Sequence, residues 1–177
     1  VYYFPSEWET QEAVWVSWTT RQDLWEGYLE TIQARCIELY RLCSNFQKVN
    51  ILCTETEQSN LMQLLNLKDP KHEIVLYNYE TDDVWIRDYG PIFLKHKSEG
   101  ILLSTDWVFN AWGGKFDLFQ KDNAVPKWLS GQLDIENISY SKILEGGAIE
   151  TNGEGMLCTT NSVLKNPNRW LQNEAIN

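Results

Sequence analysis

A stretch of helical periodicity lies between two short strand-like runs, and this alternation decides the fold class. Residues 12–18 form an alternating aromatic and β-branched run, and residues 49–53 form a short apolar run. Between them, residues 28–47 place apolar side chains three and four positions apart on one helical face: Leu29, Ile32, Cys36, Leu39, Cys43 and Phe46. A strand, a helix and a second strand in this order predict an α/β fold.

The alternation continues along the chain in units of two or three strands and a helix. Thr54 followed by Glu57 has the spacing of a capping box, which predicts that a second helix begins there. No linker or low-complexity segment divides the chain, so we expect a single domain over residues 1–177. The other expected elements are a strand at 73–79, a hairpin of 91–96 and 101–107, a helix at 123–133, a strand at 138–144, a hairpin of 148–151 and 156–160, and a helix at 168–177.

Charge and cysteine content exclude several classes of function. The formal net charge of −10 disfavours nucleic-acid binding, because phosphates require clustered Lys and Arg, and it suits a small cationic ligand. No segment approaches the ~20 apolar residues of a membrane span, and residues 1–5 do not resemble a signal peptide. The four cysteines show no metal or redox spacing. We expect them to be buried free thiols of a cytoplasmic protein.

The segment 82–91 gathers three carboxylates, an Arg, a Trp and a Tyr in one loop. A carboxylate can accept two parallel N–H groups of a planar guanidinium, and an indole face adds cation–π attraction. Asp88 and Trp85 are therefore candidates for a guanidinium clamp. In the alternative interpretation, Arg87 pairs internally with Asp83 or Asp88 and only ties down the loop.

Two glycine pairs mark further candidate positions. Trp112 precedes Gly113-Gly114, which fits either a close backbone approach to a ligand or a plain glycine turn with a packed Trp. Glu145 precedes Gly146-Gly147 after a predicted strand, which would place an acid at a pocket mouth. His72 and His96 are expected to be exposed, and no Ser-His-Asp arrangement or metal-ligand cluster is evident.

Several of these segments occur in an order that resembles a known family. They are residues 4–9, 14–18, 85–91, 109–115 and 144–147, with a strand ending in Thr159-Thr160. They resemble the agmatine deiminase family, also called the Porphyromonas-type peptidyl-arginine deiminases, over essentially the whole chain. The resemblance implies a pentein-type α/β propeller of five modules, of which this chain looks like roughly the first two to three.

The resemblance also implies a reaction and a division of roles. Family members hydrolyse a guanidinium to a ureido group and ammonia without metal or organic cofactor, through attack by a Cys thiolate. A His acts as general acid and base. By motif, Asp88 looks like the first guanidinium-binding carboxylate, Trp85 like an aromatic wall, Glu145 like a further acid and Trp112 like a pocket residue.

The chain departs from the family pattern at the nucleophile. The family's Gly-His-x-Asp segment and late Cys have no counterpart here, and Cys158 is not at the nucleophile position. We therefore expect both catalytic groups outside these residues, and we expect the isolated chain to be inactive. Half a propeller exposes a strand edge, so three alternatives stay open: a complementing C-terminal half, pairing with a copy of the chain as a homo-oligomer, or a sequence that is part of a longer chain.

The choice of substrate stays open at this level. Agmatine, giving N-carbamoylputrescine on a route to putrescine, is favoured over peptidyl-arginine by the lack of a secretion signal. A third hypothesis is a non-catalytic module that binds a cation or a sugar in a Trp-rich acidic pocket.

Overall fold

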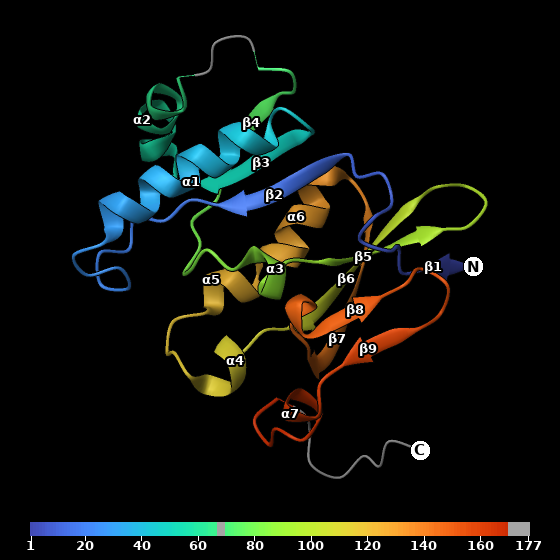
Figure 1. Ribbon diagram of the computed structural model, residues 1–177. Helices are drawn as coiled ribbons and strands as arrows, with labels where there is room; N and C mark the ends of the chain where they lie inside the picture. The colour runs from blue at the N-terminus through green and yellow to red at the C-terminus, as the bar shows by residue number, and fades with distance from the viewer. Residues whose placement is uncertain (67–69, 170–177) are drawn as a thin grey trace. The chain divides into compact units, whose positions relative to one another are not determined.

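The computed structural model describes residues 1–66 and 70–169, and the chain divides into two compact units. One unit is Thr10–Ile86, and the other combines Val1–Glu9 with Arg87–Asn177. Both units mix helices and strands, which confirms the predicted α/β class (Figure 1).

The unit Thr10–Ile86 is built on a three-stranded parallel sheet. Its strands are hydrogen-bonded in the order β2 (Ala13–Ser17), β3 (Lys48–Cys53) and β4 (Ile74–Asn78). The two connections between them are the helices α1 (Leu29–Cys43) and α2 (Glu55–Leu65). Parallel neighbours need such crossovers, so the alternating periodicity of the sequence becomes this sheet directly.

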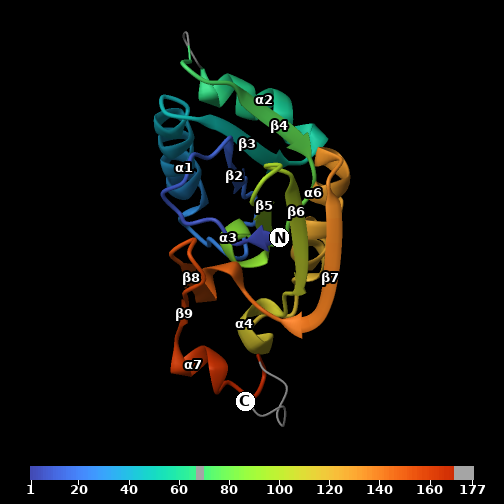
Figure 2. The same ribbon diagram turned by 90° about the vertical axis from the view of Figure 1, so that its right-hand side faces the viewer.

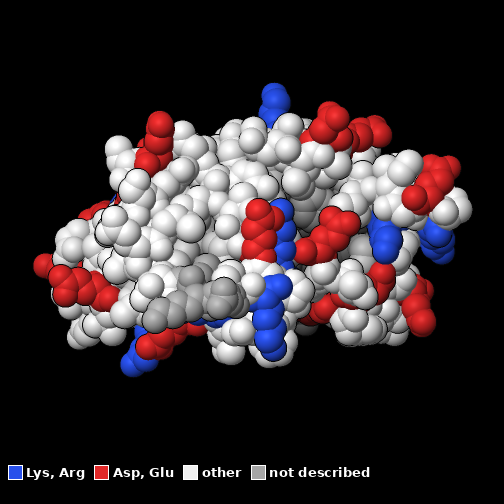
Figure 3. All heavy atoms as spheres, turned by 90° about the horizontal axis from the view of Figure 1, so that it is seen from above, with Lys and Arg blue, Asp and Glu red and all other residues white. Residues whose placement is uncertain are grey.

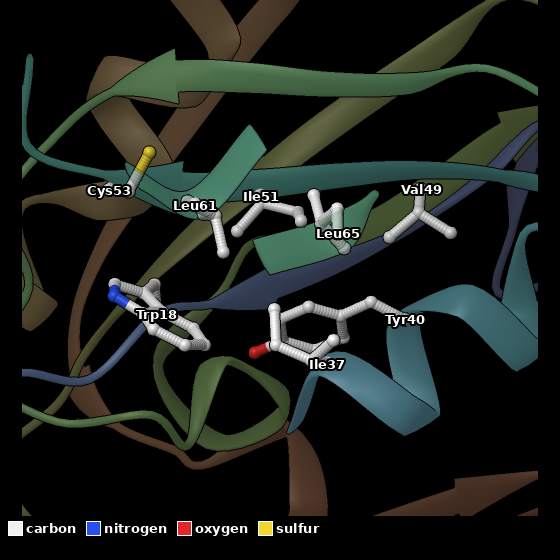
Figure 4. Packing of buried hydrophobic residues seen from close by; sticks show 8 residues of the cluster. All are labelled: Trp18, Ile37, Tyr40, Val49, Ile51, Cys53, Leu61 and Leu65. Atoms are coloured by element: carbon white, nitrogen blue, oxygen red, sulfur yellow. The ribbon is translucent and has the colours of Figure 1, made fainter. Parts of the chain in front are cut away.

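The core of this unit forms where both helices meet one face of β3 (Figure 4). Val49, Ile51 and Cys53 alternate along the strand and therefore share one face. They pack with buried side chains from the helices and from the end of β2: Ile37, Tyr40, Leu61, Leu65 and Trp18. The capping box at the start of α2 is confirmed, with the Thr54 N–H donating to the Glu57 carboxylate at 3.4 Å.

The second unit is built on a four-stranded mixed sheet. Its strands are ordered β1 (Tyr2–Tyr3), β5 (Ile92–His96), β6 (Leu102–Val108) and β7 (Glu136–Ile143). The antiparallel pairing of β5 with β6 confirms the predicted hairpin, whereas β6 and β7 are parallel. The crossover between the parallel pair consists of short helices, α4 (Ala111–Gly114), α5 (Gln120–Asn123) and α6 (Val125–Leu133).

The remaining elements of this unit surround the candidate residues. A helical turn, α3 (Ile86–Tyr89), leads into β5, and α6 packs against β6 and β7 (Figure 2). After β7 come the 3₁₀ turn η1 (Gly146–Ala148), the predicted hairpin of β8 (Ile149–Thr151) and β9 (Leu157–Thr159), and α7 (Asn161–Leu164). Of the helix predicted at 168–177, Asn168 and Arg169 lie in a turn, and the rest falls outside the described residues.

Charged side chains of both signs occur on the face drawn in Figure 3. On the face drawn in Figure 3, Lys and Arg are separated by acidic and uncharged residues. Within residues 1–66 and 70–169, no helix has the length and apolar character needed to cross a membrane.

Candidate functional site

Asp88 lies in α3, and a tryptophan distant in sequence holds its carboxylate. The indole Nε1–H of Trp112 donates to Asp88 Oδ2 at 3.0 Å. A hydrogen bond to a carboxylate is stronger than one between neutral groups, and it fixes the direction of the acceptor. The pocket residue predicted at Trp112 is therefore in direct contact with the predicted clamp carboxylate.

The glycine pair that follows Glu145 is pressed against the same helical turn. A Cβ on Gly146 would lie 2.5 Å from the main-chain oxygen of Arg87, and a Cβ on Gly147 would overlap Asp88 Oδ1. A side chain at Gly146 would force the segments apart, whereas one at Gly147 would displace the Asp88 carboxylate. The two glycines thus allow η1 to reach α3, and they bring Glu145 to the neighbourhood of Asp88.

Glu145 is buried, with 2% of its surface exposed. Burial raises the pKa of its carboxyl above the ordinary value, the Arg169 guanidinium opposes this, and the Asp88 charge adds to it. The Nε of Arg169 lies 3.0 Å from Glu145 Oε1, within ion-pair distance but out of line for a hydrogen bond. Two carboxylates and one guanidinium therefore influence one another in this part of the unit.

A left-handed turn presents Trp112 to Asp88. Four consecutive residues, from Ala111 to Gly114, have positive φ angles of 52°, 57°, 88° and 78°. Asn110 stabilises the turn by accepting a hydrogen bond from the Gly113 N–H at 2.9 Å. The Trp112 ring also meets Phe109 and Phe116 edge to face, at centroid distances of 5.2 and 5.7 Å. Gly113-Gly114 is thus part of a strained turn, and this turn orients the indole of Trp112.

Trp85 belongs to the other unit, one residue before its end, and 49% of its surface is exposed. Three residues of chain span at most about 11 Å, so connectivity alone limits its separation from Asp88. Asp88, Trp112 and Glu145 come together within one unit. For Trp85, the role of aromatic wall stays a prediction.

The acidic segment before Trp85 is engaged within its own unit. Arg21 donates from its guanidinium to the main-chain oxygen of Asp82 at 3.0 Å. Burial raises the pKa of the Asp83 carboxyl. A hydrogen bond from the Val84 N–H and the charge of Arg21 lower the same pKa.

Arg87 makes ion pairs that the alternative interpretation of the loop did not include. That interpretation named Asp83 or Asp88 as its partner, whereas the ion pairs of Arg87 join it to Glu7 at 2.6 Å and Glu150 at 3.6 Å. Asp88 accepts from Trp112 instead. The Arg next to Asp88 therefore ties α3 to the N-terminal segment and to β8.

Sequence reasoning missed Arg169 altogether. It follows a turn after α7, and Asn168 beside it accepts a hydrogen bond from the Asn110 side chain at 2.8 Å through its main-chain oxygen. Twenty-four residues separate it from Glu145, and no periodicity or spacing relates the two. Arg169 follows Lys165 by four residues in a segment rich in Asn, and this carries no signal of a pairing with Glu145.

Neither the burial of the cysteines nor the pKa of the Cys53 thiol indicates a nucleophilic thiol. Burial raises the pKa of the Cys53 thiol to about 11, with a smaller contribution from the Glu57 charge. All four cysteines are free, as expected, but Cys158 is exposed and Cys36 and Cys43 are only partly buried. The expectation of four buried thiols was wrong for Cys158, because β9 is an edge strand of a two-stranded sheet.

Among the described residues, the contacts of the two histidines do not include the candidate site residues. His72 is exposed, as predicted, whereas His96 is partly buried and hydrogen-bonds through Nε2 to the amino group of Val1 at 2.8 Å. In the described part of the chain, no group of three or more His, Cys, Asp or Glu residues could hold a metal ion.

Comparison with known proteins gives consistent matches along the chain. A family model described as Porphyromonas-type peptidyl-arginine deiminase matches residues 3–176. The agmatine deiminase of Stutzerimonas stutzeri is 35% identical over 176 residues, which are 95% of this chain and 46% of that protein. The agmatine deiminase of Medicago truncatula is 32% identical over 182 residues, with the same two coverages.

Solved structures match in the same way. A C. jejuni agmatine deiminase variant with substrate bound has a TM-score of 0.83 and 34% identity, covering 96% of this chain and 48% of that one. The agmatine deiminase of Enterococcus faecalis has a TM-score of 0.81 and 28% identity, covering 92% and 44%. The chain thus spans about half the length of the relatives it matches.

Proposed function

The chain belongs to the Porphyromonas-type peptidyl-arginine deiminase family, and from this premise we propose that it supplies the cation-binding side of a guanidine-hydrolysing active site. The fold is part of a pentein-type α/β propeller. The reaction adds water across the guanidinium carbon, releases ammonia and leaves a ureido product. Asp88 and Glu145 bind the guanidinium nitrogens, while Trp85 and Trp112 line the pocket.

One observation supports this proposal above the others. Asp88, fixed by the Trp112 indole, lies near enough to the buried Glu145 that its charge raises the pKa of that carboxyl. Two neighbouring carboxylates repel each other, and a cation bound between them relieves this repulsion. A guanidinium, planar and rich in N–H donors, suits such a pair.

The proposal assigns the attacking thiolate and the His to sequence outside these 177 residues, in the same protein or in a complementing chain. The Cys would form a thiouronium intermediate, which water hydrolyses. Residues 1–177 would then be the N-terminal part of one deiminase domain. The proposal includes a homo-oligomer of this protein. No metal or organic cofactor takes part in this scheme.

Agmatine is the substrate that we propose, with N-carbamoylputrescine as the product and a place in putrescine biosynthesis. The named relatives are agmatine deiminases, and one solved relative carries its substrate. The four free thiols favour a reducing, cytoplasmic location. The second candidate is peptidyl-arginine, which the description of the family model favours.

The test uses the full-length natural protein that contains this chain. We expect it to release ammonia from agmatine faster than from an arginine-containing peptide. Asp88→Asn should lower kcat/KM by at least about a hundredfold, because an amide cannot accept two charged N–H groups as a carboxylate does. Ammonia release, measured at several agmatine concentrations, gives both constants.

Asp134→Asn is the matched control. Asp134 is exposed, at the end of α6 with a φ of 52°, where Asn is well tolerated. Full activity of Asp88→Asn would overturn the clamp assignment. A full-length protein that binds sugars and leaves both guanidines intact would overturn the proposed function itself.

A further inference from the structure

We propose that Arg169 is a positioning residue, whose guanidinium keeps the Glu145 carboxylate charged and oriented for a cationic substrate. This inference deepens the proposed function and rests on it. Arg169 does not itself contact the substrate in this scheme. It acts through Glu145.

The geometry of the pair is that of a buried charge with a dedicated counter-ion. The Nε of Arg169 lies 3.0 Å from Glu145 Oε1, and the two side chains are only 15% and 3% exposed. A buried carboxylate without a partner is costly and tends to take up a proton instead. Arg169 is the cation that makes an ionised Glu145 tolerable at this position.

The pair is also incompletely saturated, which leaves capacity for a ligand. Arg169 Nε approaches Oε1 out of line for a hydrogen bond, so neither atom has a hydrogen-bond partner among residues 1–66 and 70–169. A carboxylate has about four lone-pair positions. Glu145 can therefore keep its contact with Arg169 and still accept N–H groups from a second guanidinium.

Two packing contacts hold Arg169 in this position. Gly113 lies against the segment, since a Cβ there would be 3.2 Å from Asn168 Cβ and 3.6 Å from Arg169 Cγ. Asn110 donates from its side chain to the main-chain oxygen of Asn168 at 2.8 Å. The left-handed turn that orients Trp112 toward Asp88 therefore also supports the residue that faces Glu145.

The charges around Glu145 determine what loss of Arg169 would do. Burial and the Asp88 charge both raise the pKa of Glu145, whereas Arg169 and, to a smaller extent, a backbone hydrogen bond lower it. Without Arg169, the largest influence that lowers this pKa is lost, while both raising influences remain. The protonated fraction of Glu145 at a given pH would increase, and a protonated acid binds a guanidinium poorly.

The experiment follows agmatine turnover against pH in the full-length protein. Arg169→Gln should move the acid limb of kcat/KM upward by about one pH unit or more, and should raise KM more than it lowers kcat. Arg169→Lys, which keeps the charge, should restore the position of the limb. Arg35→Gln is the control, because Arg35 forms an exposed ion pair with Glu38.

A double variant separates positioning from simple support of the fold. In a Glu145→Gln background, Arg169→Gln should have no further effect on KM, because the group through which it acts is gone. The double variant also leaves no unpaired buried charge, so it stays testable if Arg169→Gln alone unfolds. An equal loss from Arg169→Gln in both backgrounds, or an unmoved acid limb in a folded variant, would overturn the proposal.

A readout independent of activity distinguishes this inference from the proposed function. Carbon-13 NMR of labelled Glu carboxyls, with Glu145 assigned by its loss in Glu145→Gln, reports the titration of Glu145 directly. Its midpoint should be higher in Arg169→Gln than in the parent, and an unchanged midpoint would overturn the inference. If the midpoint rises and agmatine is not hydrolysed, only the proposed function fails.

Discussion

The indole of Trp112 is carried by backbone that L-amino acids rarely adopt. Ala111 and Trp112 have φ angles of 52° and 57°, and each such residue costs about 1–2 kcal/mol. The hydrogen bond to Asp88 and the cap from Asn110 offset part of this cost. Trp112 was predicted as a pocket residue, yet its role toward Asp88 could not be predicted. The pairing depends on a turn conformation that Ala and Trp do not favour.

Trp112→Phe tests this contact at the scale of one residue. The variant keeps an aromatic ring but loses the N–H, so Asp88 is no longer held in one orientation. We expect kcat/KM of the full-length protein to fall about tenfold, as for the loss of one hydrogen bond to a charged group. Steady-state kinetics with agmatine measures it.

Trp107→Phe provides the comparison for Trp112→Phe. Its indole also donates one hydrogen bond, to the Thr105 hydroxyl at 3.0 Å. This variant should retain activity. Equal losses in the two variants would mean that the bond to Asp88 has no special role.

Helices and strands were predicted well, but the faces that they bury were predicted less well. The parallel strands and the capping box follow from period and local chemistry. In the helical pattern 28–47, however, Leu39 of α1 and Phe46, beyond its end, were assigned to the core face and are 51% and 75% exposed. The buried residues are Ile37 and Tyr40, which form an equally helical pattern rotated by about one residue.

Another set of features depends on contacts between distant segments, which local patterns do not encode. Strand β1 has two residues and exists because Tyr2 and Tyr3 pair with His96 and Lys95. The ion pair of Glu145 with Arg169 is of the same kind, since neither residue carries a local signal of the other.

The approach of η1 to α3 gives a prediction at the scale of elements. Gly147→Ala should displace the Asp88 carboxylate, because the new Cβ would overlap its Oδ1. We expect a loss of activity and a decrease of about 1–3 kcal/mol in the free energy of unfolding, as for other overpacked sites. Urea denaturation and agmatine turnover in the full-length protein measure the two effects.

Gly131→Ala is the matched substitution, because a Cβ on this residue of α6 meets nothing within 4 Å. It should stabilise the protein by about 0.5–1 kcal/mol, the usual gain for Ala over Gly in a helix. A Gly147→Ala variant that is as stable and as active as the parent would contradict the close approach.

For the molecule as a whole, the chain provides one side of a proposed site. The carboxylates, an indole and a counter-ion are brought together here, in a chain that spans about half the length of its relatives. The family motifs pointed to Asp88 and Glu145, whose roles stay predictions. The nucleophile was not predictable as a residue number, because no cysteine of these 177 residues matches its motif.

The isolated 177-residue chain is therefore expected to release no ammonia from agmatine above background. In the proposed reaction a thiolate attacks the substrate, and burial raises the pKa of the Cys53 thiol to about 11, well above neutral pH. Ammonia release from the isolated chain and from the full-length protein, with circular dichroism to verify folding, makes the comparison. Turnover by a folded isolated chain would show that a cysteine of this segment is the nucleophile.

The pairing of β1 with β5 has a consequence for the order of events during synthesis. Tyr2–Tyr3 leaves the ribosome before its partner strand Ile92–His96, and the whole unit Thr10–Ile86 is translated between them. That intervening unit is contiguous in sequence, so its sheet can form before β1 has paired with β5. We expect folding on the ribosome to begin in the unit Thr10–Ile86. Tyr2 and Tyr3 are then expected to be among the last residues to pair.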